Sequence, residues 1–533
     1  MLEEDRIVAV WLNMGEMLRV NATKFPHKMA VKGIAVKDGF NELSFAQYNE
    51  KACRLANAWL DMGLKKGDRI AVLLYNVVEY MEIYVAAAKA GLVIVPINFR
   101  WVGPEIEYVV NHSESKAFIC SEEFLKEVES VRGNFEGVAA GRFMFIGPTD
   151  KTPEGYVNYE EIIAAGSPEE PGIKVEPRET WIHLYTSGTT GKPKGVIRSH
   201  ESYTAFYLIN EVDFGFRFDD IGLIVMPLCH VNSTFYSFVF TYIGGGVYVH
   251  RARAYDPQEL LQIIDREKVT YTSLVPTHYI MMLNLPDEIK SKYDLSSMRQ
   301  LLISSAPARK DTKLGIMEMF PNAALFEAYG STEAGLVTLL KPHEQLTKLG
   351  SIGKACAGTD LVKVLDEEGN EVPVGEVGEL YSRGPMMFDE YWKMPEKTAA
   401  SFRGEYFSAG DLARRDEDGY LYIVDRKDNM IITGGEKVYP TEVENVVGSH
   451  PSVLDVAVIG VPDPKWGEAV KAVVIPKDPD HPPMEEEILE YCRGKMAGYK
   501  RPKSVDFIKP EEMPRTASGK IVHTELRSRY EER

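Results

Sequence analysis

Short apolar strands alternate with helices along much of this chain, and this alternation constrains the fold more than any other feature. Arg69–Tyr75 predicts a strand, Val78–Ala90 a helix and Leu92–Ile97 a second strand. Such a strand–helix–strand unit implies a parallel sheet with helices on its faces. Further strands are predicted at Ile221–Val225, Thr270–Val275, Gln300–Ser304 and Ala324–Glu327. The predicted fold class is therefore α/β.

The length of the chain and a change of pattern along it predict more than one domain. A chain of 533 residues is too long for a single hydrophobic core. From Gly350 to Tyr422, short strands with frequent glycines predict a small antiparallel sheet or barrel. We therefore expect an N-terminal domain at 1–424, a charged hinge at 425–429 and a small α+β domain at 430–533. Residues 121–179 are predicted to be a polar connection, and Glu485–Met496 an amphipathic helix.

Composition excludes several classes of function. The net charge of −18 argues against a general nucleic-acid-binding or anionic-membrane surface. The acidic start lacks the basic and apolar regions of a signal peptide, and the apolar runs are too short or too interrupted to span a bilayer. The five cysteines are scattered without a C-x-x-C pair, so neither a disulfide framework nor a zinc site is indicated. We expect a cytoplasmic protein.

The segment Thr186–Gly195 has the composition of a phosphate-binding loop. Seven of its ten residues are Gly, Ser or Thr and two are Lys, and the apolar segment before it predicts a buried strand. Backbone N–H groups, hydroxyls and two ammonium groups suit a polyphosphate. It is not a Walker loop, which needs four residues between its glycines and Ser or Thr after its Lys. A nucleotide is therefore predicted, whereas a P-loop ATPase or kinase is not.

Five motifs in register carry a resemblance to a known family. They are Tyr185–Gly195, Tyr329–Glu333, Ser408–Asp411, Asp425–Asp428 and Pro514–Lys520. Together they resemble the adenylate-forming superfamily of acyl-CoA synthetases, luciferases and peptide-synthetase adenylation domains, over nearly the whole chain. The resemblance implies a large N-terminal region of stacked α/β sheets with a small barrel-like β region, then a small mobile α+β domain. Asp425, Ala409 and His523 depart from the residues usual in the family, without removing a principal role.

The resemblance implies a complete ATP site. ATP would be bound by the loop residues Thr186, Ser187, Gly188, Thr189, Thr190, Gly191 and Lys194, by Ser305, Ala306, Pro307, Glu327, Ala328, Tyr329, Gly330, Ser331 and Thr332 around the adenine, and by Asp411 and Arg426 at the ribose. Glu333 would bind Mg²⁺, which carboxylate and phosphate oxygens suit. Lys520 would act as the catalytic lysine between the attacking carboxylate and the α-phosphate.

The remaining assignments concern the acid and coenzyme A. By resemblance, Gly434, Gly435, Glu436, Lys437 and Trp466 would contact CoA, Asp428 would be the hinge residue, and His230 would lie near the acyl carbonyl. The acyl pocket is predicted at Val231, Phe235, Tyr236, Thr277 and Gly335. The bulky residues among them favour a short- or medium-chain or compact aromatic acid.

The predicted function is an AMP-forming ligase that joins a carboxylic acid to CoA, with ATP, Mg²⁺ and CoA as its small-molecule partners. An acyl-AMP ligase that loads a carrier protein is a rival, although no carrier domain follows residue 533 and the segment 434–437 favours CoA. A luciferase-like oxygenase and a non-catalytic nucleotide-binding regulatory protein are further candidates; the regulatory protein requires Lys520 and Glu333 to be idle. The sequence leaves the oligomeric state open, a homodimer included.

Overall fold

The chain forms two compact units, each described below by itself. A computed structural model describes residues 12–36, 39–186, 192–251, 255–305, 308–434, 436–516 and 519–531. The first unit contains the described residues up to Asp360 together with Arg383–Ser401. The second contains Leu361–Ser382 and the described residues from Phe402 onward.

The first unit contains two large sheets. Among the described residues, eight strands form one of them, in the order β19 (Glu390–Tyr391), β9 (Lys194–Ser199), β8 (Thr180–Thr186), β4 (Val93–Pro96), β3 (Arg69–Leu73), β5 (Ala117–Ser121), β6 (Phe143–Ile146) and β7 (Val157–Asn158). The strands from β8 to β7 pair in parallel, whereas β9 is antiparallel to both β8 and β19. The predicted strand–helix–strand unit lies at the centre of this sheet, as β3, α3 (Val78–Ala90) and β4.

The second sheet of this unit is also parallel at its centre. Within the described ranges it has nine strands, in the order β16 (Lys354–Ala355), β15 (Gly335–Leu340), β14 (Ala324–Ser331), β13 (Gln300–Ile303), β12 (Tyr271–Leu274), β10 (Ile221–Ile224), β11 (Gly246–Val249), β1 (Met29–Gly33) and β2 (Asn41–Ser44). The antiparallel strands β2, β15 and β16 lie at its two ends.

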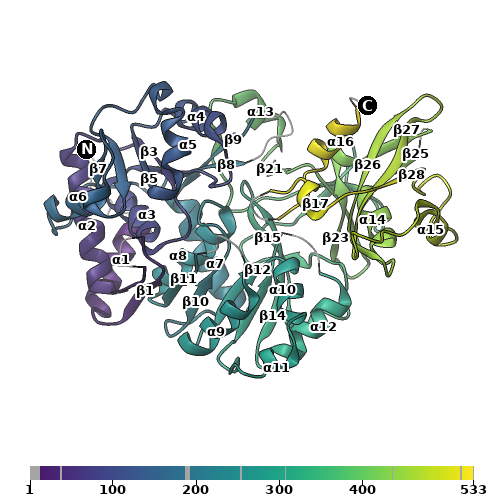
Figure 1. The fold of residues 1–533 in the computed structure, drawn as a ribbon, viewed down its shortest axis with the longest axis horizontal. Coiled ribbons are helices and arrows are strands. Elements are labelled where there is room, and N and C mark those ends of the chain that lie inside the picture. The colour runs from purple at the N-terminus through teal and green to yellow at the C-terminus, as the bar shows by residue number, and fades with distance from the viewer. Residues whose placement is uncertain are drawn as a thin grey trace, which may run out of the picture. The chain divides into compact units, whose positions relative to one another are not determined.

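Helices lie between the two sheets and form much of the core (Figure 1). Every residue of α3 is buried, and this helix contacts β4 of one sheet and β1 of the other. Helix α8 (Val231–Ile243) packs on β10 and β11, and its Phe238 contacts the Trp181 ring of β8 at 5.4 Å between centroids. Helix α2 (Phe45–Asp61) begins at a capping box formed by Ser44 and Gln47. The other long helices are α1 (Met14–Lys24), α4 (Gly103–His112), α7 (His200–Phe214), α9 (Pro257–Glu267), α10 (Pro276–Leu283) and α12 (Lys310–Met319).

The second unit contains smaller sheets. In its described part, four antiparallel strands pair as β17 (Lys363–Leu365), β18 (Gly378–Tyr381), β22 (Asp411–Arg415) and β23 (Leu421–Arg426), beside the hairpin β20 (Phe402–Arg403) and β21 (Tyr406–Phe407). Another sheet is formed by β25 (Glu436–Val438), β24 (Ile431–Thr433), β27 (Gly467–Pro476), β26 (Val453–Asp463) and β28 (Ser504–Phe507). Helices α14 (Pro440–Gly448), α15 (Glu485–Tyr491) and α16 (His523–Glu531) accompany it. The predicted hinge segment, 425–429, includes the last two residues of β23 and the 3-10 turn Lys427–Asn429 that follows it.

Two expectations about secondary structure were wrong. Residues 121–179 are more than a connection, because β6 and β7 extend the eight-stranded sheet and α5 (Leu125–Glu129) and α6 (Tyr159–Ala165) lie in the same segment. Frequent glycines and prolines between these short elements concealed them. The helix expected at Glu485–Met496 ends at Tyr491.

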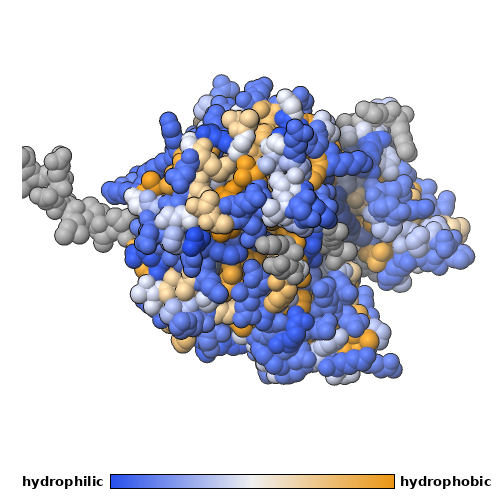
Figure 2. Space-filling view, turned by 60° about the vertical axis from the view of Figure 1, so that its left-hand side comes forward, coloured by the Kyte–Doolittle hydropathy of each residue, from blue (hydrophilic) through white to orange (hydrophobic). Residues whose placement is uncertain are grey.

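The surface is mixed in character. On the face shown in Figure 2, hydrophilic residues predominate and hydrophobic residues lie in scattered patches. Across the described part of the chain, none of the helices combines the length and the apolar character needed to cross a bilayer.

Gly33 at the end of β1 tests the packing between β1 and β11. Its φ is +146°, and a Cβ atom there would lie 2.2 Å from the Val249 carbonyl oxygen. We predict that Gly33→Ala lowers the free energy of unfolding by about 2–4 kcal/mol, because backbone strain adds to a clash with backbone. Urea unfolding would measure this. Gly67→Ala is the matched control, since φ is +84° there and no atom lies within 4 Å; an equal loss in both variants would contradict the prediction.

Four histidines, of which two are buried and two are half-buried, predict a loss of stability in acid. Burial lowers the pKa of His183 and His200 to about 3 and that of His230 and His278 to about 4, from the ordinary value of 6.5. Because unfolding lets them take up protons, the free energy of unfolding should fall as the pH drops from 6.5 towards 4, by up to about 1.4 kcal/mol per pH unit for each histidine. Urea unfolding at a series of pH values would measure the slope. His200→Phe should reduce it, whereas His343→Gln, at an exposed histidine, should not; an unchanged slope for His200→Phe would refute this cause.

Candidate active site

The phosphate-binding loop predicted from the sequence connects two antiparallel strands. Thr186 ends β8 and Lys194 begins β9, and the two residues are paired directly across the ladder. The next residue is Gly195. A Cβ atom at this position would lie 2.1 Å from Nε2 of His183, so a residue with a side chain would clash with the histidine. The predicted loop residues Ser187, Gly188, Thr189, Thr190 and Gly191 lie outside the described residues.

Tyr391 brings together two predicted site residues that are far apart in the sequence. Its hydroxyl donates a hydrogen bond to Oε1 of Glu333 at 2.8 Å. Nζ of Lys194 lies 4.9 Å from the centre of the same ring, within the range of a cation–π contact. A carboxylate and an ammonium group thus contact one aromatic side chain, the first at its hydroxyl and the second over its ring. This pair suits a metal-bound polyphosphate, because the carboxylate can bind a cation and the ammonium group an anion.

Arg198 supports the turn that carries Glu333. Its side chain is fully buried, and Nη1 donates to the carbonyl oxygen of Thr332 at 2.6 Å. The other amino group, Nη2, donates to the Met386 carbonyl. Within the turn itself, the Ser331 hydroxyl accepts a hydrogen bond from the Ala334 N–H at 2.9 Å. Burial lowers the pKa of Arg198, but arginine stays charged in proteins. The position of Glu333 therefore depends on a buried cation.

The predicted adenine-binding residues lie at the carboxyl ends of β13 and β14. Ala328, Tyr329, Gly330 and Ser331 belong to β14 itself, which runs further than the sequence predicted. Ser305 has a φ of +69°, an uncommon conformation for a residue with a side chain. Ala306 and Pro307 lie outside the described residues.

Glu327, also predicted to bind ATP, is engaged with the protein. Its carboxylate lies 2.5 Å from Nζ of Lys313 on α12, and both side chains are buried. Burial raises the pKa of Glu327, and Lys313 and the Ala308 N–H oppose that shift. The ion pair joins β14 to α12. The hydrogen bond from the Ala308 N–H joins β14 to the residue that follows the Ser305–Pro307 segment.

His230 begins α8 at the end of the segment that follows β10. Burial lowers the pKa of its imidazole to about 4, so the ring is neutral at physiological pH. Its Nδ1 is buried without a hydrogen-bond partner in the described structure. A neutral imidazole with a free nitrogen can donate or accept a hydrogen bond from a polar ligand.

The predicted acyl-pocket residues have different environments. Phe235 and Tyr236 of α8 are buried, and Phe235 stacks on Phe206 with centroids 3.8 Å apart. Tyr236 lines a small cavity together with Tyr271 and Asn232. Val231 is partly buried and Gly335 is buried, whereas Thr277 is exposed on α10. The structure therefore brings some of these residues, but not Thr277, to an aromatic interior.

In the second unit, the predicted ribose ligands lie opposite each other on two strands. Asp411 of β22 pairs with Arg426 of β23 in the ladder, and Nε of Arg426 lies 2.7 Å from Oδ1 of Asp411. Arg426 also donates to the Ala409 carbonyl oxygen at 3.0 Å. Desolvation and the charge of Arg426 lower the pKa of Lys520, while Asp411 and Asp425 oppose them. Asp411, Arg426 and Lys520 thus lie in one electrostatic environment.

The predicted CoA-binding residues form a loop and a neighbouring strand. The Gly434 N–H donates to the Trp466 carbonyl oxygen at 2.8 Å, and a Cβ atom on Gly434 would lie 2.9 Å from the Trp466 ring. Trp466 is 43% exposed, and Glu436 and Lys437 of β25 are exposed too. Gly435 lies outside the described residues, and Asp428 lies in the short 3-10 turn Lys427–Asn429. The tryptophan is available to a ligand while packed on the glycine.

Sequence reasoning missed Tyr391, Arg198 and Lys313, which are single residues outside the motifs. Tyr391 and Lys313 have no local signal, because each meets its partner only in the fold. Arg198 had a weak one, a charged residue inside the apolar strand segment that follows Gly195. Across the described residues, His, Cys, Asp and Glu side chains do not gather into groups of three or more that could hold a metal ion.

Comparisons with known proteins identify the family of this chain. Residues 18–392 match the family model described as AMP-binding enzyme, and residues 442–520 match the AMP-binding enzyme C-terminal domain. Feruloyl-CoA synthase of an Amycolatopsis species is 36% identical over 94% of this chain and 97% of its own. The long-chain-fatty-acid–CoA ligase FadD13 of Mycobacterium tuberculosis is 33% identical over 97% of this chain and 98% of its own.

A solved structure extends the likeness to three dimensions. ATP-bound MatB from Rhodopseudomonas palustris is 30% identical, with a TM-score of 0.85 over 97% of this chain and 99% of that chain. Both the sequence motifs and the architecture are thus shared over almost the full length. The chain belongs to the family of AMP-binding enzymes.

Proposed function

We propose that this enzyme, an AMP-forming acid–CoA ligase, activates a compact carboxylic acid, either aromatic or of short to medium chain length. The observation that carries the ATP-dependent step is the contact of Lys194 and Glu333 with Tyr391, which joins the phosphate-loop motif to the Tyr329–Glu333 motif. An ATP-dependent step that releases pyrophosphate needs both a cation for the phosphates and a carboxylate for a metal ion.

The first half-reaction joins the acid to AMP. A carboxylate oxygen of the acid attacks the α-phosphorus of ATP, and the bond from that phosphorus to the bridging oxygen of the β-phosphate breaks. Both reactants are anions, so catalysis consists mainly of positioning and charge stabilisation. Lys194 and the loop hold the departing pyrophosphate, Asp411 and Arg426 hold the ribose, and Lys520 stabilises charge at the α-phosphate. Mg²⁺ held by Glu333 would neutralise charge on the phosphates when bound.

The second half-reaction forms the thioester. The thiol of CoA attacks the acyl carbonyl carbon of acyl-AMP, the thiol proton is lost, and the bond between that carbon and the AMP oxygen breaks. Gly434 offers backbone without a side chain beside the exposed Trp466, which suits close approach of a slender pantetheine arm. Asp428, between β23 and β24, is the proposed hinge about which the segment 430–533 reorients between the two steps.

The aromatic interior supports the choice of a compact acid. Phe206, Phe214, Phe235, Tyr236 and Tyr271 contact one another around α8. Rings packed in this way leave little depth for a long alkyl chain. A planar aromatic acid would gain offset or edge-to-face ring contacts in the same place.

One assay tests the reaction and the acid together. The protein is incubated with ATP, Mg²⁺ and acids from acetate to palmitate, with benzoate and a hydroxycinnamate, each with and without CoA. AMP formation that requires both a compact acid and CoA is expected. Release of ADP, or no AMP with any acid, would overturn the ligase proposal; AMP with palmitate alone would overturn only the compact acid. Turnover without CoA, on addition of a carrier protein, would favour the rival carrier-loading ligase.

Lys520 should act in only one of the two steps. We predict that Lys520→Ala slows acyl-AMP formation by about 100- to 1000-fold, the usual cost of losing one group that stabilises transition-state charge. Thioester formation from supplied acyl-AMP should be unchanged. Lys503→Ala removes another exposed lysine of the same unit and should affect neither step. Equal loss of both steps in Lys520→Ala would contradict the assigned role.

Tyr391 should influence the metal requirement through Glu333. We predict that Tyr391→Phe raises the Mg²⁺ concentration needed for half-maximal pyrophosphate release by about 10-fold, because residues that orient a metal ligand contribute to metal affinity. Tyr156→Phe is the control, since its hydroxyl makes a similar 2.7 Å hydrogen bond to Glu129 elsewhere in the unit. A similar Mg²⁺ dependence for both variants and the parent enzyme would show that Tyr391 does not orient Glu333 for this purpose.

A further inference from the structure

Lys520 is carried by a tight hairpin that leads directly into the last described helix. The Val522 N–H donates to the Pro514 carbonyl oxygen at 2.9 Å, and the Thr516 N–H donates to the Lys520 carbonyl oxygen at 2.8 Å. The Lys520 N–H donates to Oγ1 of Thr516 at 3.1 Å. These bonds fix the hairpin internally, but none of them fixes its direction relative to the rest of the unit. Arg515 of the hairpin pairs with Asp455 of β26, and Ile521 packs against the core beside Leu526, so the start of α16 is one of three attachments that set this direction.

His523, the first residue of α16, connects the hairpin to two other elements. Its Nε2 lies 2.6 Å from Oε1 of Glu444 on α14. The same carboxylate oxygen accepts a hydrogen bond from the Val458 N–H of β26 at 2.8 Å. Both side chains are mostly buried, at 18% and 19% exposure. One carboxylate therefore holds the start of α16 against a helix and a strand.

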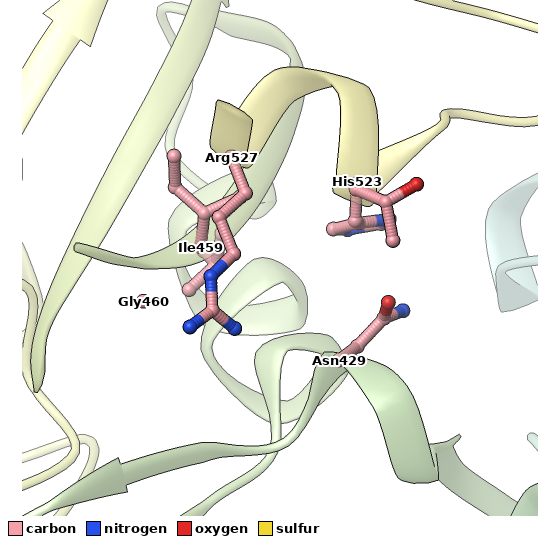
Figure 3. Close-up of a pocket in the computed structure, with 7 residues that line it drawn as sticks. Asn429, Ile459, Gly460, His523 and Arg527 are labelled. Atoms are coloured by element: carbon pink, nitrogen blue, oxygen red, sulfur yellow. The ribbon is translucent and has the colours of Figure 1, made fainter. Parts of the chain in front are cut away.

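A second pair holds α16 one turn further on. Nη2 of Arg527 lies 2.5 Å from Oε1 of Glu468 on β27, and Oε2 of Glu468 accepts from the Ile432 N–H at 2.7 Å. Figure 3 shows His523 and Arg527 leaving the helix beside a small cavity that Asn429 also lines. Leu526, between them in sequence, is buried in the core with Ala457 and Ile459. The helix therefore stays attached without His523. The contact of His523 with Glu444 fixes the position of its first turn.

We propose that His523 is a positioning residue for Lys520, which its imidazolium form holds in the adenylating orientation through Glu444. This inference rests on the role proposed above for Lys520. The positive charge matters because a charged hydrogen bond to a carboxylate is about twice as strong as a neutral one. A neutral imidazole can still donate from Nε2 to the Glu444 carboxylate, but this hydrogen bond is weaker because the positive charge is gone. The hairpin would then be held less firmly, and a displacement of about 1 Å costs up to about 100-fold in rate.

The charges around His523 determine how the contact between His523 and Glu444 changes with pH. Burial lowers the pKa of His523, but the hydrogen bond and charge of Glu444 and the charge of Asp425 outweigh it, so the pKa is raised above 6.5; Lys520 opposes this. Arg527 of α16 and Glu468 of β27 form an ion pair, so their charges offset each other near His523. The imidazolium is therefore complete below about pH 6.5 and is lost as the pH rises through the raised pKa. Adenylation should weaken in that direction.

The experiment measures each half-reaction separately across pH 6 to 9.5 in the full-length enzyme. His523→Gln removes the charge, and His523→Arg makes it permanent. We expect His523→Gln to slow acyl-AMP formation about 10- to 100-fold at pH 6.5, with thioester formation from supplied acyl-AMP unchanged. His523→Arg should restore the rate and move the alkaline decline upward, to the titration of Lys520. His481→Gln, at an exposed histidine that also pairs with a carboxylate, should match the parent enzyme.

Each contrary outcome overturns a distinct statement. If His523→Gln slows both half-reactions equally, or neither, His523 does not act through Lys520. If His523→Arg shows the same alkaline decline as the parent enzyme, the imidazolium is not the responsible group. Lys520→Ala in the same assay separates the two levels of the argument: full adenylation by that variant overturns the role of Lys520 and this inference together. Loss in Lys520→Ala with none in His523→Gln overturns this inference alone.

Discussion

The antiparallel pairing of β9 with its two neighbours is the constraint on which the first unit's site depends. β8 pairs on one side and places Thr186 opposite Lys194. β19 pairs on the other, where the Trp392 N–H donates to the Gly195 carbonyl oxygen at 2.8 Å and Tyr391 lies opposite Val196. One strand therefore fixes the ends of the phosphate loop and the ring that contacts Glu333.

The same strand places a positive charge where water cannot reach it. An isolated charge in a protein interior is costly unless hydrogen bonds compensate it. Arg198 meets this condition with backbone carbonyl oxygens of Thr332 and Met386, and Asp389 and Glu333 favour its charge from a distance. Carbonyl partners leave the Glu333 carboxylate available to a ligand, which a direct ion pair with Arg198 would not. The buried arginine thus orients the acid without neutralising it.

The sequence was most informative where a physical pattern is local. Helix α3 was predicted with its observed bounds, because a run of helix-forming apolar residues and the glycine that ends it act within a few residues. The strands and helices within residues 121–179 were not predicted, because short strands such as β6 are stabilised by their neighbours in the sheet more than by their own composition. Tyr391 and Lys313 could not be found, because a tyrosine and a lysine acquire a role only through partners distant in the sequence. Thr277 stays a prediction, since its side chain on α10 is exposed and its contact with an acid depends on a ligand.

The cations of the second unit lose their protons at different pH. Arg426, paired with Asp411, stays protonated at any working pH. Lys520 has a lowered pKa and His523 a raised one, so both lose charge as the pH rises. Both serve the first half-reaction in the scheme above, whereas the segment proposed for CoA, with its exposed Glu436, Lys437 and Trp466, has no charge-stabilising role at the reacting atoms in that scheme. An alkaline medium should therefore slow adenylation before it slows thioester formation, and the slower step of the cycle becomes the one that consumes ATP. In that regime the enzyme would hold little acyl-AMP, and the balance between its two half-reactions would follow from the charge on one lysine and one histidine.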